Sequence, residues 1–136
     1  DGLANDHTDG HVDNLARFVG PGVVACPVGW GADDPNDAVY DATARTLTAE
    51  GLTVIRIPSP GRIENEDGEP IPASHMNFLV ANGAVIVPSY GDEAAAAAAC
   101  GALATMFSGR QIIALPSLAI LTGGGSFHCI SQQEPA

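Results

Sequence analysis

A succession of strand, strand, helix and strand occurs twice in this chain, and it constrains the fold more than any other feature. In the first copy, apolar runs flank Gly20-Pro21-Gly22 within residues 12–27, which predicts two short strands joined by a turn. Asn36 can cap the following helix, and Gly51 stands where a C-terminal cap belongs. Residues 52–57 then predict a buried strand.

The second copy repeats this order further along the chain. Residues 77–87 predict a strand pair that turns at Asn82-Gly83, Asp92-Glu93 opens an alanine-rich helix, and residues 112–115 predict the last strand. Alanine forms helices well and permits close approach of a neighbour, so this helix is expected to pack tightly. Equivalent prolines in the two copies are 61 and 58 residues apart (Pro27 with Pro88, Pro58 with Pro116). The chain is therefore predicted to be an α/β protein with two repeated ββαβ units.

The start of a third unit is expected near the C-terminus. A histidine stands beside the beginning of each predicted strand pair or strand (His11, His75 and His128). If the units are arranged radially, corresponding strand ends meet near one central point. Two units and the start of a third cannot close a ring, and open strand edges favour association. We therefore expect this chain to be part of something larger, either a homo-oligomer or a complex with a complementing N-terminal fragment.

The charge of the chain excludes some partners. Five arginines, no lysine and 16 acidic residues give a net charge of −11, which repels phosphate backbones and anionic membranes. Neither a nucleic acid nor a membrane is expected as a partner, whereas a small cation is compatible. Three cysteines without a CxxC pair indicate a reducing compartment. With no signal-peptide pattern and no apolar run of 18 residues, a cytoplasmic location is expected.

The strongest local signal for chemistry is the segment Gly123 to Ile130, GGGSFHCI, which delivers Cys129 to the start of a predicted strand. Glycines allow the main chain to approach a ligand closely, so Gly124 and Gly125 are candidate substrate contacts. Cys129 is either a nucleophile, which needs a thiolate, or a small buried apolar residue. Adjacent strand residues face opposite sides, so His128 is expected to be a poor partner for Cys129.

His11 and Asp13 are the candidate acid/base and anion. Two residues apart on a predicted strand, they would face one ligand together. A turn residue and a solvated charge are the alternatives. The segment also holds five potential metal ligands (Asp6, His7, Asp9, His11 and Asp13). Residues 8–10 predict a turn that would separate the two imidazoles, so no metal is expected, although a thiol together with His11 could also bind zinc.

Three motifs in this order resemble the C-terminal part of agmatine deiminase, a member of the guanidine-modifying superfamily that includes Porphyromonas-type peptidylarginine deiminase. They are residues 8–18 (TDGHVDNLARF), 76–80 (MNFLV) and 123–133 (GGGSFHCISQQ). The resemblance spans nearly the whole chain. It implies a five-bladed α/β propeller, the pentein fold. Residues 1–136 would be the C-terminal portion of its catalytic domain, with the N-terminal half absent.

The resemblance also implies roles for individual residues. Cys129 would be the nucleophile, His11 the general acid/base and Asp13 the carboxylate that holds the guanidinium, with Asn77 near the pocket. His75 departs from the aromatic residue that is frequent there. The implied reaction, without cofactor or metal, converts agmatine and water to N-carbamoylputrescine and ammonia through a covalent amidino-thioether. The family's further acidic substrate-binding residues come from the N-terminal half, so the isolated chain is expected to be poorly active. A peptidylarginine deiminase and a non-catalytic interaction module are the alternatives.

Overall fold

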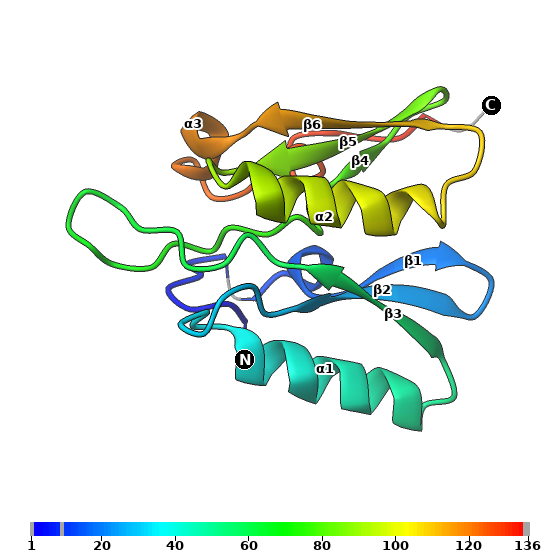
Figure 1. Cartoon of the computed structure of the whole chain (residues 1–136), viewed down its shortest axis with the longest axis horizontal. Coiled ribbons are helices and arrows are strands. Elements are labelled where there is room, and N and C mark those ends of the chain that lie inside the picture. Colours follow the sequence, from blue (N-terminus) through cyan, green and yellow to red (C-terminus); the bar gives the residue numbers. More distant parts are fainter. Residues whose placement is uncertain (1, 9, 135–136) are drawn as a thin grey trace.

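The computed structural model describes residues 2–8 and 10–134, which form two three-stranded sheets with one long helix each (Figure 1). The first unit contains β1 (Arg17–Gly20), β2 (Val23–Val28), α1 (Asp37–Ala49) and β3 (Thr53–Pro58). The second contains β4 (Leu79–Val80), β5 (Ala84–Ser89), α2 (Glu93–Ala104) and β6 (Gln111–Pro116). A 3₁₀ helix, η1 (Val12–Asn14), precedes β1, and a short helix, α3 (Leu118–Leu121), follows β6.

The two sheets have the same topology. In each, the first two strands pair antiparallel and the second and third pair parallel, in the orders β1-β2-β3 and β4-β5-β6. The registers also correspond, because Pro27 lies opposite Ile57 while Pro88 lies opposite Leu115. The predicted α/β class and the predicted repeat of strand, strand, helix and strand are therefore confirmed.

Both long helices begin where their sequence signals predict. Asp92 caps α2, since its carboxylate accepts hydrogen bonds from the N–H groups of Ala94 and Ala95 at 2.9 and 3.0 Å. Asn36 precedes α1, but its side-chain oxygen accepts from the N–H of Ala4 instead of capping the helix. Gly51, just beyond α1, has a φ of +82°, which glycine adopts without strain.

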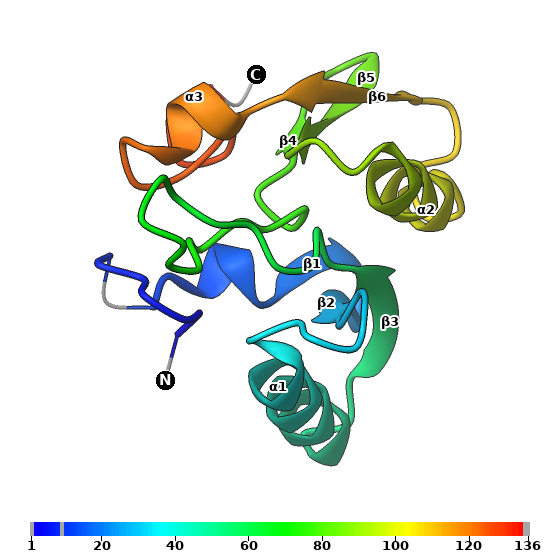
Figure 2. The same cartoon turned by 60° about the vertical axis from the view of Figure 1, so that its left-hand side comes forward.

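Helix α2 lies between the two sheets (Figures 1 and 2) and packs on β3 of the first unit as well as on β5 and β6 of its own. Its buried face consists of small residues and one leucine (Ala95, Ala96, Ala99 and Leu103). Small side chains let the helix axis approach both sheets, which confirms the prediction of a tightly packed helix. One apolar cluster contains Ile57 of β3, Val85 of β5 and Leu103 of α2. This shared core fixes the two units relative to each other.

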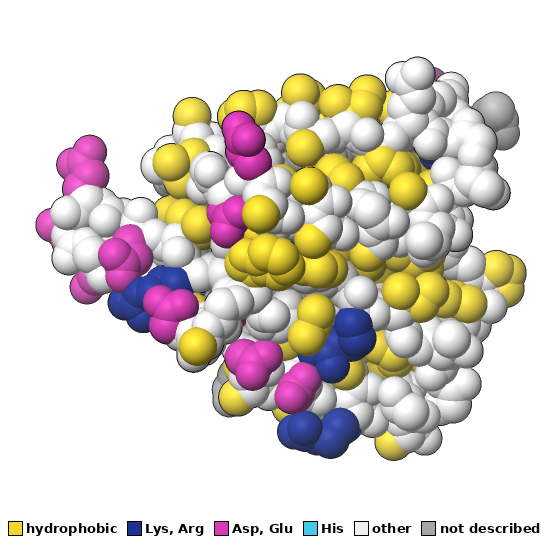
Figure 3. Space-filling model, in the orientation of Figure 1, with side chains coloured by type: hydrophobic (Ala, Val, Ile, Leu, Met, Phe, Trp, Pro, Cys, Tyr) yellow, Lys and Arg dark blue, Asp and Glu magenta, His cyan; other side chains and the backbone are white. Residues whose placement is uncertain are grey.

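The surface carries exposed apolar residues on β1, β6 and the segments around the sheet ends (Val12, Phe18, Ile113, Leu115, Leu118 and Ile130). Such exposure favours the expectation of a larger assembly, which stays a prediction. The loop between β3 and β4 is acidic and protrudes from the molecule (Figures 1 and 3). Within the described part of the chain, no helix has the length and apolar character needed to cross a membrane.

The first predicted strand begins later than expected. Residues 12–14 form η1 because the N–H groups of Leu15 and Ala16 both donate to the carbonyl of Val12, at 2.9 and 2.8 Å. The expectation that His11 and Asp13 share one face of a strand is therefore wrong. Instead, His11 directly precedes the 3₁₀ helix η1 and Asp13 lies within it.

Candidate active site

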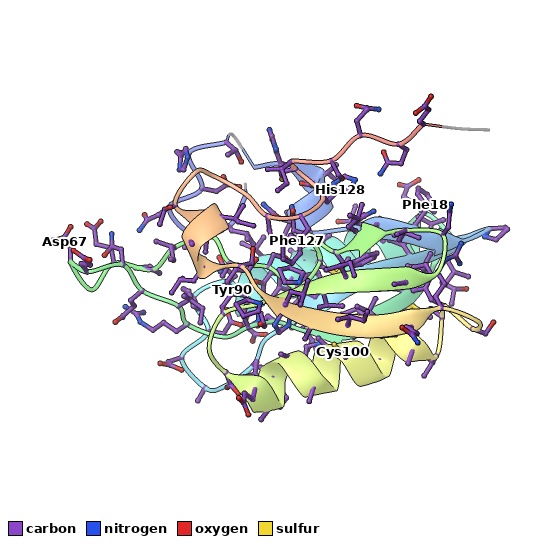
Figure 4. The ribbon with its side chains drawn as sticks, turned by 90° about the horizontal axis from the view of Figure 1, so that it is seen from above. Phe18, Asp67, Tyr90, Cys100, Phe127 and His128 are labelled. Carbon is purple, nitrogen blue, oxygen red and sulfur yellow. The ribbon has the colours of Figure 1, made fainter. Side chains whose placement is uncertain are left out.

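The turn of residues 127–130 lies against η1, and three predicted functional side chains come together there. The ligand atoms of His11, Asp13 and Cys129 lie within 4.8 Å of one another. Cys129 Sγ is 3.4 Å from Asp13 Oδ2, although 116 positions separate these residues in the sequence. Figure 4 shows the neighbouring His128 beside the N-terminal segment, with Asp67 at the far tip of the acidic loop. The sulfur, the imidazole and the carboxylate thus share one site.

Cys129 lies in a turn of residues 127–130, so the prediction that it begins a strand is wrong. The N–H of Ile130, which a strand ladder could have used, donates to the carbonyl of Ser126 at 3.2 Å. The turn presses against the glycine loop, because a Cβ atom at Gly125 would lie 2.8 Å from Cys129 Sγ. This close approach explains why a glycine precedes the turn.

The three cysteines differ sharply in access to solvent. Cys129 is exposed, Cys100 is half-buried and Cys26 is completely buried. Burial raises the pKa of Cys26 to about 11 and also raises the pKa of Cys100. Since the thiolate is the nucleophilic form, Cys26 is unreactive at neutral pH and Cys129 is the accessible sulfur.

Asn77 connects the groups of the site, although it is only 1% exposed. Its Nδ2 lies 3.1 Å from Asp13 Oδ2, 3.1 Å from Asn14 Oδ1 and 3.0 Å from Cys129 Sγ. Its Oδ1 accepts from the N–H groups of His128 and Cys129 at 3.1 and 3.2 Å. The predicted place of Asn77 near a substrate pocket stays a prediction, since its amide is committed to protein groups.

His128 approaches Asp13 closely, with 2.6 Å between His128 Nδ1 and Asp13 Oδ2. The expectation that His128 faces away from the cysteine is wrong, because both side chains of the turn reach the same carboxylate oxygen. Burial alone would raise the pKa of Asp13, but hydrogen bonds from His128 and Cys129 and the charges of His128 and His11 lower it below its ordinary value. Asp13 is therefore ionised at neutral pH. Its Oδ1 is enclosed and has no hydrogen-bond partner among the described residues.

The loop before Cys129 passes close to the N-terminal segment at a second glycine. Gly124 has a φ of +94°, and a Cβ atom there would lie 2.7 Å from His7 Nε2. The positive φ favours glycine at this position, and a larger residue would also displace the His7 imidazole. The predicted contacts of Gly124 and Gly125 with a substrate stay predictions, since packing of the loop already accounts for both.

The described residues of the acidic N-terminal segment do not form a metal site by themselves. Asp6 accepts a hydrogen bond from the N–H of Thr8 at 2.8 Å, and His7 packs against the glycine loop. Asp9 lies outside the described residues. Among the described residues, one group of possible metal ligands lies close enough together to hold an ion. It consists of the imidazole of His11, the carboxylate of Asp13 and the thiol of Cys129. This donor set suits zinc as well as a guanidinium cation, so the two are distinguished below by experiment.

His75 lies in different surroundings from the other two motif histidines. It is 1% exposed, its Nδ1 lies 2.9 Å from the carbonyl oxygen of Pro58, and its ring stacks on Tyr90 with centroids 6.1 Å apart. Burial lowers the pKa of His75, so this ring is neutral at pH 7. His75 is therefore a buried residue of the segment that carries Asn77.

Comparison with known proteins agrees with this arrangement. A family model described as Porphyromonas-type peptidyl-arginine deiminase matches residues 1–135. The agmatine deiminase of Pseudomonas putida is 36% identical over 162 aligned positions, which cover 100% of this chain and 43% of that protein.

Solved structures give the same result. The agmatine deiminase of Enterococcus faecalis superposes with a TM-score of 0.83 at 32% identity, over 99% of this chain and 43% of that one. A variant of the C. jejuni enzyme with substrate bound gives 0.83 at 26% identity, over 93% and 37%. The chain thus spans less than half the length of these relatives. It belongs to the Porphyromonas-type peptidylarginine deiminase family.

Proposed function

We propose that this chain supplies the nucleophile, the acid/base and one substrate-holding carboxylate of an enzyme that hydrolyses the guanidine group of agmatine. The observation that carries the proposal is the 3.4 Å separation between Cys129 Sγ and Asp13 Oδ2, with His11 in the same group. A carboxylate can hold two N–H groups of a planar guanidinium and place its carbon in front of the sulfur. Agmatine is the substrate named by the relatives, whose matched structures include one with substrate bound.

The reaction divides into two steps. The Cys129 thiolate adds to the guanidinium carbon, and the protonated His11 gives its proton to the departing ammonia, which leaves a covalent amidino-thioether. The neutral His11 then takes a proton from water, which attacks the same carbon and breaks the C–S bond. As the C–S bond breaks, the hydroxyl proton of the intermediate is lost and is taken up by the released ammonia, so the products are N-carbamoylputrescine and ammonium, with the thiolate and the protonated His11 restored. No redox step is involved, and no cofactor is called for.

Asp13 has one oxygen committed to the protein and one without a partner. Oδ2 is shared by His128, Asn77 and Cys129, whereas the enclosed Oδ1 has no hydrogen-bond partner in the described part of the chain. An enclosed acceptor without a donor costs about 1–3 kcal/mol. Because Oδ1 is enclosed, a guanidinium N–H would recover this cost only when the groups around Oδ1 move aside on binding.

The two ββαβ units would form part of a pentein propeller, with the segment after β6 as the beginning of a third unit. The remaining length of the relatives would supply the other units and further acidic residues for the substrate. One carboxylate holds a planar cation from one side only, so we expect the isolated chain to release ammonia from agmatine slowly or not at all. Rapid ammonia release by the purified 136-residue chain would contradict this expectation.

The first experiment compares two alkylating reagents on the isolated chain, with modification of each cysteine followed by mass spectrometry. Neutral iodoacetamide will modify Cys129 because it is exposed, so the informative quantity is the rate with cationic 2-chloroacetamidine divided by the rate with iodoacetamide. Asp13→Asn should lower this ratio by about tenfold, equivalent to ~1.4 kcal/mol. The matched control, Asp67→Asn, removes an exposed carboxylate from the distant loop and should not change it. Equal ratios in the wild type and Asp13→Asn would refute the proposed cation site.

The second experiment tests turnover in a chimera. Residues 1–136 replace the matching segment of the P. putida agmatine deiminase, and ammonia release is measured from agmatine and from an arginine-containing peptide. We expect release from agmatine, its abolition by Cys129→Ser, and no change after dialysis against EDTA. Citrulline formation in the peptide would indicate a peptidylarginine deiminase instead. No release from either would indicate a non-catalytic module, and loss of activity with EDTA would indicate a metal site.

A further inference from the structure

Arg17 is a half-buried charge that the proposed mechanism does not use. Among the residues that the structure describes, it forms no ion pair within 4.0 Å of a carboxylate. Burial lowers the pKa of Arg17, while the negative charges of Asp13 and Cys129 oppose that shift. A guanidinium nevertheless stays protonated in proteins. Burying such a charge without a directly paired anion is costly, so its contacts need an explanation.

The contacts of Arg17 converge on the segment that carries Asn77. Its Nη1 donates to the carbonyl oxygen of Met76 at 3.4 Å and to that of Phe78. Its guanidinium carbon lies 4.3 Å from the centroid of the Phe78 ring, which is completely buried. One nitrogen therefore contacts the carbonyl groups of the residues before and after Asn77, and the aromatic ring fixes the plane of the guanidinium.

Residues 76–78 lie before β4, so sheet pairing does not fix them. The N–H of Asn77 donates to the carbonyl of Ser74 at 3.3 Å and its carbonyl accepts from the N–H of His128 at 3.2 Å, and Arg17 adds its contacts with the neighbouring carbonyls. Together these bonds orient the backbone that carries the Asn77 side chain. That side chain in turn determines where Asp13 Oδ2 and Cys129 Sγ lie, through contacts of 3.1 and 3.0 Å. A rotation of residues 76–78 would therefore break both of these contacts of Asn77 at once.

We propose that Arg17 is a positioning residue that fixes Asn77 and thereby sets the distance between the Cys129 sulfur and the Asp13 carboxylate. The inference rests on the proposed function of this site. Arg17 opens β1 directly after the η1 segment, so one short stretch of chain supplies both the carboxylate and the group that orients Asn77. The negative charges of Asp13 and Cys129 lie near enough to Arg17 to oppose the effect of burial on its pKa, which places the guanidinium beside the site.

The test uses the same cysteine labelling of the isolated chain, because the chain carries its own controls. Arg17→Met removes the charge and the donors but keeps the apolar stem, whereas Arg17→Lys keeps the charge with a shorter reach. Arg110 is exposed and also donates to a carbonyl, that of Ala81 at 3.1 Å, so Arg110→Met is the matched control. Buried Cys26 reports unfolding, since it is labelled only when the core opens.

The expected result is a loss of cation preference at Cys129 without unfolding. Arg17→Met should lower the chloroacetamidine-to-iodoacetamide ratio at Cys129 by about tenfold, because a displacement of about 1 Å in a reacting group costs up to about 100-fold in rate. Arg17→Lys should recover part of the ratio, and Arg110→Met should match the wild type. Cys26 should stay unlabelled throughout. A purely structural role would expose Cys26 and leave the ratio unchanged in the molecules that remain folded.

The outcomes separate this inference from the proposed function. If Asp13→Asn lowers the ratio but Arg17→Met does not, the role assigned to Arg17 is wrong while the cation site stands. If Asp13→Asn has no effect, the proposed function fails and the inference fails with it. If Arg17→Met labels Cys26, Arg17→Lys decides, since it keeps the charge but its shorter side chain cannot reach both carbonyls. An unchanged ratio in that variant, with Cys26 protected, would overturn the inference, and a lowered ratio would support it.

Discussion

Replacing Asn77 by aspartate tests the geometry of the site through stability alone. The change is nearly isosteric and keeps an oxygen to accept from the N–H groups of His128 and Cys129. It replaces the Nδ2 donor by a second carboxylate oxygen, 3.1 Å from Asp13 Oδ2 and 3.1 Å from Asn14 Oδ1. Two attractive contacts thereby become repulsive in a position that is 1% exposed.

The magnitude follows from the contact distance. Two unit charges 3.1 Å apart repel by about 5 kcal/mol at an effective dielectric constant of about 20. The pair can bind a proton instead, which at pH 7 costs about 4 kcal/mol for a carboxyl group with an ordinary pKa near 4. The loss in the free energy of unfolding is therefore limited to about 4 kcal/mol at pH 7, and it should shrink by about 1.4 kcal/mol for each unit by which the pH falls towards 4.

The sign of this pH dependence differs from that of the wild type. In Asn77→Asp the pKa of the carboxyl pair is raised in the folded state, so folding takes up a proton and stability returns as the pH falls. In the wild type the pKa of Asp13 is lowered, so its contribution is present at neutral pH and is lost only when the pH falls through its folded-state pKa.

The assay is urea unfolding at pH 7.5 and pH 5.0, followed by fluorescence of Trp30, the single tryptophan of the chain. The indole N–H of Trp30 donates to Asp92 at 3.1 Å, so its emission reports the docking of the first unit on the second. Asn77→Ala is the control, because it removes the same contacts without adding a charge and should cost about 1–3 kcal/mol at both pH values. Equal losses for both variants at both pH values would refute the assigned contacts of Asn77.

Two further changes address the turn and the loop. His128→Asn removes the imidazole hydrogen bond that lowers the pKa of Asp13, so NMR titration of Asp13 should show a higher pKa than in the wild type, and an unchanged value would contradict the 2.6 Å contact. Gly125→Ala places a Cβ atom 2.8 Å from Cys129 Sγ and should slow iodoacetamide labelling of Cys129 by about tenfold through displacement of the sulfur. Gly83→Ala, whose Cβ atom would meet nothing within 4 Å, should leave that rate unchanged, and equal rates in both glycine variants would contradict the close approach.

The elements of the fold could be predicted where neighbouring residues carry the signal. Asn82-Gly83 marks the turn between β4 and β5, and Asp92 caps α2 with its own side chain. These choices depend on residues within a few positions of one another. The repeat of proline positions extends the same local signals to the second unit, which is why the order of strands and helices is correct in both copies.

The turn at Cys129 could not be predicted in this way, because contacts distant in sequence determine it. The N–H groups of His128 and Cys129 donate to the side chain of Asn77, 51 and 52 positions away. The side-chain alternation expected of a strand therefore predicted the wrong backbone conformation for residues 127–130. It also predicted the wrong direction for the His128 side chain. The three side chains of the candidate site were nevertheless expected to lie together, as they do, since the motif resemblance does not depend on the backbone conformation; their catalytic roles stay predictions.

The position of Asn77 makes the site a property of both units together. Asp13 precedes the first unit, Asn77 precedes the second, and Cys129 follows it, so the Nδ2 contacts of Asn77 exist only when the units are docked. Docking depends on α2, whose small side chains pack on β3 of the first unit as well as on its own sheet. The shared core therefore does more than stabilise the chain. The packing of alanines in α2 determines whether a carboxylate near one end of the sequence meets a thiol near the other.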